Sequence, residues 1–165
     1  MGLTMLPEDV MINVYKSRFV PEEYIGAENI RLSVYKSLAS ASSEADLDRI
    51  VFSLINRFGN IPGPLYNVIN EYRLRLLAAR VGICSILLKG CGVQFCIEAQ
   101  NREGFGDTLI NYINAYWGRL GVDYHIIPST NNLLGFCVHL SAAEDKYSNI
   151  SDFLDKFKSV EKLNN

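Results

Sequence analysis

The sequence has none of the common motifs that mark an active site. It lacks a Gly-x-x-x-x-Gly-Lys-[Ser/Thr] phosphate loop and a Gly-x-Ser-x-Gly nucleophile motif, so neither a P-loop ATPase nor that common hydrolase arrangement is indicated. No apolar run is long enough to cross a bilayer, and no basic segment followed by an apolar stretch opens the chain. We therefore expect a cytoplasmic chain that contacts no membrane and has no catalytic residue.

Residues that bind metals are also scarce. The chain has 2 histidines and 4 cysteines, and no Cys-x-x-Cys pair occurs. His125 and His139 both fall in expected strands, where a packed imidazole is the ordinary interpretation and a metal pair or a general base is the alternative. Cys91 and Cys96 would join them as zinc ligands only by a coincidence of folding. We expect reduced thiols, no metal and no cofactor, and a metal- or thiol-dependent enzyme ranks last among the hypotheses.

An excess of charge of one sign is lacking as well. Lys and Arg total 16 and Asp and Glu total 18, so the net charge of -2 provides no general attraction to nucleic-acid phosphates. Arg73 and Arg80 are seven residues apart on one face of a predicted helix. They support the alternative hypothesis of a small nucleic-acid-binding module, although an ion-paired surface is the ordinary interpretation. Gly104-Phe105-Gly106 lacks the third glycine and the parallel strands of a dinucleotide-binding loop.

The chain is rich in signals for the starts and ends of helices. Apolar residues at helical spacing predict helices over 27–41, 44–58 and 64–82. Ser43 stands three residues before an acidic residue, as in a capping box, and Gly59 suits a helix C-terminus. Short connections predict that the three helices pack as antiparallel neighbours.

The second helix has the clearest division between an apolar and a polar face. Six residues are predicted to face the core: Leu47, Ile50, Val51, Leu54, Ile55 and Phe58. Ser53, Asn56 and Arg57 must then point outward, where they are candidates for a docking contact. The simpler role of Arg57 is to interact with the negative end of the helix dipole.

Short runs with alternating apolar residues predict strands. The expected strands cover residues 10–15, 83–88, 93–98, 122–127 and 133–140. Helical spacing returns at 107–120 and 149–163. The predicted fold is α+β, with a helical N-terminal half packed on a small, largely antiparallel sheet with C-terminal helices. We expect a single domain over residues 1–165, in which 1–9 are a linker or an artificial leader.

Four sequence blocks stand in a recognisable order between Val10 and Gly92. They are Pro21-x-x-Tyr24-Ile25, Asn29-x-Arg31-Leu32-x-x-Tyr35-Lys36-x-Leu38-Ala39, Arg57-Phe58-Gly59-x-x-Pro62 and Leu74-Arg75-x-x-Ala78-x-x-x-Gly82-Ile83. In order and spacing they resemble the C-terminal domain of bacterial transcription-repair coupling factor. From Val93 onward the sequence has no motif that matches this family.

The resemblance implies the last domain of a large DNA translocase that displaces stalled RNA polymerase and recruits nucleotide-excision repair to DNA damage. In that family the motor, with its ATP and Mg, lies upstream, and the C-terminal domain catalyses no reaction. It packs against an N-terminal UvrB-like region, hides the surface that recruits UvrA, and restrains the motor until RNA polymerase is engaged. The implied partners are therefore the UvrB-like region and, indirectly, UvrA, RNA polymerase and DNA.

The chain departs from the family on the second helix. The family commonly reads Glu-Leu-Ile-Asp-Arg-Phe-Gly, whereas this chain reads Ser-Leu-Ile-Asn-Arg-Phe-Gly from Ser53 to Gly59. Two acids are replaced by neutral residues, Ser53 and Asn56, while Arg57 remains. We expect an inter-domain contact that relies on hydrogen bonds and Arg57 and depends less on salt.

Overall fold

A computed structural model describes residues 6–90, 92–98, 105–127, 133–140 and 146–163. These residues form five α-helices and a five-stranded sheet in which one strand pair is parallel and the others are antiparallel. The predicted α+β class is therefore confirmed. The chain divides into two compact units, residues 15–76 and residues 1–14 with 77–165. The expectation of a single domain stays a prediction. Within the described ranges, no helix is both long and apolar enough to cross a membrane.

The first unit, residues 15–76, is helical. It contains α1 (Glu28–Ser40), α2 (Glu44–Phe58) and most of α3 (Gly63–Val81), close to the three predicted helices. Its core consists of buried apolar side chains from all three helices and the segment before them: Val20, Ile25, Val34, Leu38, Leu47, Leu54, Leu65, Val68, Ile69 and Leu76.

The ends of α2 follow the local sequence signals. The Ser43 hydroxyl accepts a hydrogen bond from the Asp46 amide at 3.2 Å, which confirms the predicted N-cap. The Asp46 carboxylate accepts from the amide and the hydroxyl of Ser42, and these bonds hold its pKa below the ordinary value. At the other end Gly59 has a φ of 88°, which favours glycine, and its amide donates to the Ile55 carbonyl at 2.9 Å.

The buried stripe of α2 is narrower than the sequence predicts. Leu47 and Leu54 are buried, but Ile55, predicted to face the core, is 44% exposed, and its neighbour Phe52 is 68% exposed. Ile55 lies about 100° around the helix from Leu54. A unit with only three helices covers one side of α2, so a residue at that angle remains in solvent.

A buried carboxylate fastens the segment before α1 to α3. Glu71 is only 6% exposed, and its two oxygens accept from the Arg18 guanidinium at 2.7 Å and from the Tyr15 amide at 3.3 Å. Nearby, the Asn67 side chain donates to the Ser17 carbonyl at 2.8 Å. These hydrogen bonds satisfy backbone groups of a segment that has no helix or sheet to provide partners for them.

The second unit contains the sheet, with strand order β1-β2-β3-β5-β4. The strands are β1 (Met11–Asn13), β2 (Ile83–Lys89), β3 (Gly92–Glu98), β4 (Tyr124–Ile127) and β5 (Leu133–Val138). A short 3-10 turn, Pro7–Asp9, precedes β1. β1 pairs in parallel with β2, although 69 residues separate Asn13 from Ile83 in the chain. The five strands lie where the sequence predicts them, and β4 is left at one edge.

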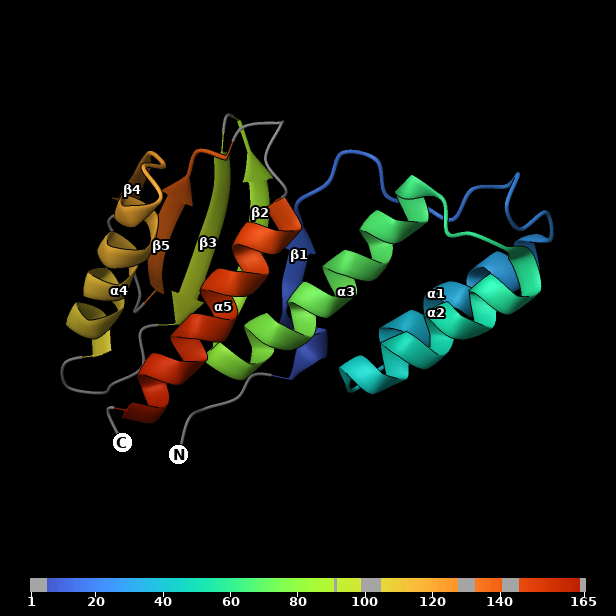
Figure 1. The fold of residues 1–165 in the computed structure, drawn as a ribbon, viewed down its shortest axis with the longest axis horizontal. Coiled ribbons are helices and arrows are strands. Elements are labelled where there is room, and N and C mark those ends of the chain that lie inside the picture. Colours follow the sequence, from blue (N-terminus) through green and yellow to red (C-terminus); the bar gives the residue numbers. More distant parts are fainter. Residues whose placement is uncertain (1–5, 91, 99–104, 128–132, 141–145, 164–165) are drawn as a thin grey trace. The chain divides into compact units, whose positions relative to one another are not determined.

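The helices α4 (Phe105–Arg119) and α5 (Lys146–Leu163) cover the same face of this sheet (Figure 1). Phe95 on β3 stacks on its cross-strand partner Phe136 on β5, with ring centroids 4.5 Å apart. Trp117 on α4 and Phe153 on α5 stack on each other at 5.3 Å above them. This aromatic cluster is the core of the second unit.

We predict that Glu71→Gln lowers the free energy of unfolding by about 2 kcal/mol, because it removes the charge from a buried hydrogen-bond acceptor. Urea denaturation measures this value. Asp48→Asn is the control, since it removes a carboxylate of the same unit whose side chain is 66% exposed. Exposed ion pairs contribute about 1 kcal/mol or less. Equal losses in the two variants would contradict the anchoring role of Glu71.

Candidate functional site

The three docking candidates on α2 are all exposed, as predicted, but only two of them line the same groove. Ser53 and Arg57 are one turn apart and line a groove of about 250 Å³ between α1 and α2. Asn56 is not among the groove residues. Asn56 lies about 60° around the helix from Ser53, at the edge of the groove and one turn from the exposed Phe52. The structure therefore places Ser53 and Arg57 in one groove and Asn56 beside it.

The α1–α2 groove combines an apolar floor with hydroxyl and guanidinium groups. Its lining residues are Ile30, Ser33, Val34 and Ser37 from α1, with Arg49, Ile50, Ser53, Leu54 and Arg57 from α2. Arg57 lies in the last turn of α2, with its guanidinium carbon 4.9 Å from the centroid of the Phe58 ring. The ring and the negative end of the helix both stabilise this positive charge. Arg49 bonds Asp46 at 2.6 Å, yet its side chain is 75% exposed.

The candidate arginines of α3 have different environments. The Arg73 side chain is 19% exposed, and its guanidinium bonds Asp48 at 2.6 Å and lies 3.7 Å from Glu44, both on α2. Arg80 is exposed in the last turn of α3. Because Arg73 is held by two carboxylates, it supports the ion-paired interpretation of this helix face.

The two histidines, which the sequence places in separate strands, meet in space. His139 Nε2 lies 3.4 Å from His125 Nδ1, and Cys137 Sγ belongs to the same group. Cys96 lies on β3 outside this group, and its carbonyl accepts a hydrogen bond from the Cys84 thiol. Cys91 lies outside the described residues. Among the described residues, Cys84, Cys96 and Cys137 form no disulfide bond.

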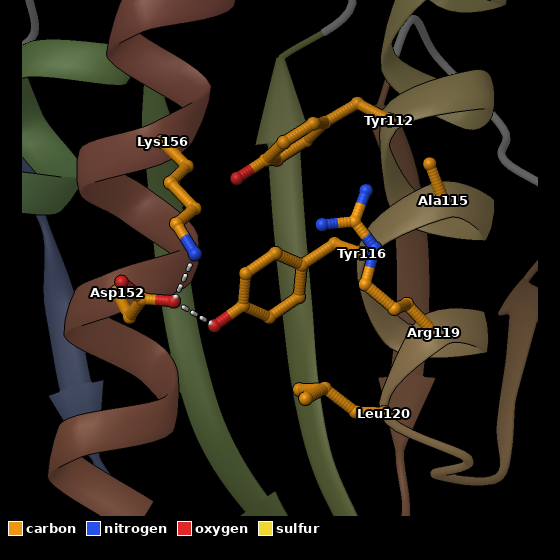
Figure 2. Close-up of a pocket in the computed structure, with 7 residues that line it drawn as sticks. All are labelled: Tyr112, Ala115, Tyr116, Arg119, Leu120, Asp152 and Lys156. Atoms are coloured by element: carbon orange, nitrogen blue, oxygen red, sulfur yellow. Dashed lines mark hydrogen bonds and ion pairs between the residues drawn. The ribbon is translucent and has the colours of Figure 1, made fainter.

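A second pocket, of about 380 Å³, lies between α4 and α5, and the sequence analysis did not identify it (Figure 2). The Tyr116 hydroxyl donates to the Asp152 carboxylate at 2.6 Å, and the Lys156 ammonium lies 3.1 Å from the same oxygen. The Tyr112 hydroxyl donates to the Phe153 carbonyl. The sequence contained one signal for this site. Tyr112 and Tyr116 are four residues apart, as are Asp152 and Lys156, so each pair lies on one face of its helix.

The electrostatics of this pocket keep both phenols protonated. Burial raises the pKa of Tyr112 and of Tyr116 well above the ordinary tyrosine value. The hydrogen bond from Tyr116 lowers the pKa of the Asp152 carboxyl, with a smaller contribution from Lys156. Tyr116, Asp152 and Lys156 thus satisfy one another, which suits a structural contact between the two helices better than a reactive site.

We predict that Tyr116→Phe raises the pKa of Asp152 toward its ordinary value, because the variant removes the main hydrogen bond to the charged carboxylate. An NMR titration of the side-chain carboxyl carbon measures it. Tyr112→Phe is the control, since that hydroxyl donates to a backbone carbonyl. Equal shifts in the two variants would contradict the assignment.

The sign of the linked stability change follows from the same pKa. A lowered carboxyl pKa stabilises the fold above the ordinary value of 3.8, and this contribution is lost as the pH falls through the lowered pKa. Tyr116→Phe should therefore lose less stability than the unmodified chain on acidification below about pH 4.

Comparisons with known proteins agree with this architecture. A family model described as the TRCF domain matches residues 15–106, more than half of the chain. The transcription-repair-coupling factor of Haemophilus influenzae is 35% identical over 100 residues, which are 59% of this chain and 9% of that protein. The Escherichia coli protein is 42% identical over 64 residues, 39% of this chain and 6% of that protein. The matched region is thus about a tenth or less of either relative.

A solved structure extends the comparison to the whole fold. The crystal structure of the C-terminal domain of transcription-repair coupling factor matches with a TM-score of 0.76 and covers 95% of this chain and 96% of that one. At 13% identity this similarity shows a shared fold. Together with the match over residues 15–106, it means that the chain belongs to the TRCF domain family, the C-terminal domain of transcription-repair coupling factor.

Proposed function

We propose that this chain is a non-catalytic regulatory domain that docks on the N-terminal UvrB-like region of its own parent protein. Docking hides the surface that recruits UvrA and restrains the ATP- and Mg-dependent motor of a translocase that acts in the bacterial cytoplasm. The observation that carries the proposal is the TRCF match over residues 15–106, which includes α1 and α2 entirely. In this proposal the ATP and Mg of the motor bind upstream of this chain, and RNA polymerase and DNA contact other parts of the parent.

The chemistry of the α1–α2 groove supports docking on this side. Arg49 and Arg57 are two turns apart along α2, with Ser53 between them. Ser33 and Ser37 add hydroxyl groups from α1. A partner segment with carboxylates matches this arrangement, because arginine binds carboxylate through two parallel hydrogen bonds.

The replaced acids change the character of the contact. The family's acidic positions are Ser53 and Asn56 in this chain, so the groove side of α2 carries no negative charge at position 53 to oppose an acidic partner. Part of the binding energy then comes from neutral hydrogen bonds, which salt screens little. Beside the groove, Asn56 borders the exposed Phe52, and Phe52 together with the exposed Ile55 extends the contact surface with apolar area.

A nucleic-acid role is less well supported. That alternative requires Arg73 and Arg80 to reach phosphates together. Arg73 is instead ion-paired with Asp48 and Glu44, so two carboxylates lie beside its guanidinium. Their negative charge repels a phosphate backbone.

We predict that Arg57→Glu weakens the complex between this chain and the parent's UvrB-like region about tenfold, or about 1.4 kcal/mol, because it puts a negative charge opposite the partner's carboxylates. Isothermal titration calorimetry measures the change. Lys36→Glu is the matched control, since Lys36 is exposed on α1 but does not line the groove. If both reversals weakened binding equally, the groove would not be the docking site.

We further predict that deleting this chain from the parent raises basal translocase activity and exposes UvrA binding, because both are restrained by docking. Translocation assays without RNA polymerase and UvrA pull-downs measure the two effects. The parent with Arg57→Glu should show the same changes in weaker form. Unchanged activity together with unchanged UvrA binding in the deletion would overturn the regulatory role.

A further inference from the structure

Three potential metal ligands meet on the face of the sheet opposite α4 and α5. Phe136 and Val138 on β5 are fully buried on the helix-covered side. Because side chains alternate along a strand, Cys137 between them points to the other face. His125 on β4 is the register partner of Cys137, and His139 follows Cys137 by two residues. The backbone bond from the His139 amide to the Asp123 carbonyl, 2.8 Å long, continues the ladder and holds His139 in line.

The donor atoms of the three residues lie close together. The sulfur of Cys137 and one ring nitrogen of each histidine all lie within 4.8 Å of one another. His139 Nε2 and His125 Nδ1 are 3.4 Å apart. Two nitrogens that bind a tetrahedral zinc at about 2.0–2.1 Å stand about 3.3–3.4 Å apart. The imidazoles therefore already have the separation of two ligands on one ion.

A glycine on the neighbouring strand leaves room for these side chains. A Cβ placed on Gly92 would lie 2.7 Å from Cys137 Sγ and 3.4 Å from His139 Nδ1. No larger residue at position 92 would therefore leave both groups where they are. Cys137 is 7% exposed, whereas His125 is exposed, so the group is closed on the β3 side and open to solvent on the β4 side. An ion can enter on that side, and a fourth ligand position faces water.

We propose that His125, Cys137 and His139 bind one Zn²⁺ ion, with water as the fourth ligand. One thiolate and two imidazoles are ligands that zinc prefers, and they fit calcium and magnesium poorly. The proposal departs from the expectation of a metal-free chain, which rested on the separation of these residues in the sequence. All three ligands lie beyond residues 15–106, so the TRCF match does not account for them.

The ion would fasten the edge of the sheet. β4 has four residues, lies last in the strand order and pairs with β5 alone among the described strands. An edge strand of this kind is weakly held and exposes unpaired backbone groups. A metal bond from His125 to two residues of the β5 side adds a cross-link between the strands. Because the ion binds the folded arrangement, it stabilises the fold by an amount that rises with the logarithm of its concentration relative to Kd, once that concentration exceeds Kd.

The test uses the reduced, metal-free 165-residue chain and Co²⁺ as a spectroscopic substitute for Zn²⁺. We expect binding of one equivalent, with a thiolate-to-cobalt charge-transfer band and the visible bands of a tetrahedral ion, and displacement of cobalt by Zn²⁺. Cys137→Ser should abolish the charge-transfer band, and His125→Ala should weaken binding at least tenfold. Cys96→Ser is the control, because that thiol lies outside the group, and it should bind like the unmodified chain.

Thermal unfolding provides a second measurement. Zn²⁺ should raise the Tm of the unmodified chain and of Cys96→Ser, and should raise the Tm of His125→Ala by a smaller amount at the same concentration. His125 is exposed, so this variant keeps the metal-free fold, as circular dichroism checks, and decides the question even if Cys137→Ser does not fold. Absence of the thiolate band, or equal affinity in His125→Ala, would overturn the proposal.

Discussion

The burial of Leu47 and Leu54 on α2 determines the surface of the helical unit. These two residues, two turns apart, hold one side of the helix in the core and so fix the direction of every other side chain on it. Ser53 and Arg57 consequently line the α1–α2 groove, and Phe52 points to solvent. The same rotation brings Asp48 to Arg73 of α3. The burial of Leu47 and Leu54 therefore determines three features of the unit. These are the groove, the exposed apolar side of α2, and the ion pair that joins α2 to α3.

Sequence reasoning predicts this unit well where the signals are local. Ser43 and Gly59 specify the ends of α2 through hydrogen bonds and backbone angles within a few residues, and the structure has both. The prediction that Ile55 faces the core was wrong. The burial of this side chain depends on how many elements pack around the helix, and apolar periodicity carries no information on that number. The anchor between Glu71 and Arg18 spans 53 positions, and no local pattern indicates a buried carboxylate there.

The candidate sites depend even more on contacts between residues that are distant in the sequence, which local patterns do not predict. His125 and Cys137 become neighbours only in one register of β4 against β5, and a shift of one residue would place them on opposite faces. The tertiary pairing that creates this register is set by Phe136 and Val138 packing under the helices, far from any ligand motif. Arg73 likewise bonds Asp48, which is 25 residues away in the sequence. This ion pair makes a phosphate contact by Arg73 less favourable.

The distribution of similarity along the chain explains why two kinds of chemistry can coexist. The family match covers α1, α2 and α3 and continues through β2 and β3. The strands β4 and β5 lie outside that match, yet the fold is shared over 95% of the chain at 13% identity. Gly92 lies within the match, whereas Cys137 and His139, which it borders, lie beyond it. Since the groove and the histidine–cysteine group belong to different compact units, the proposed docking contact and the proposed metal site can be tested separately by mutation.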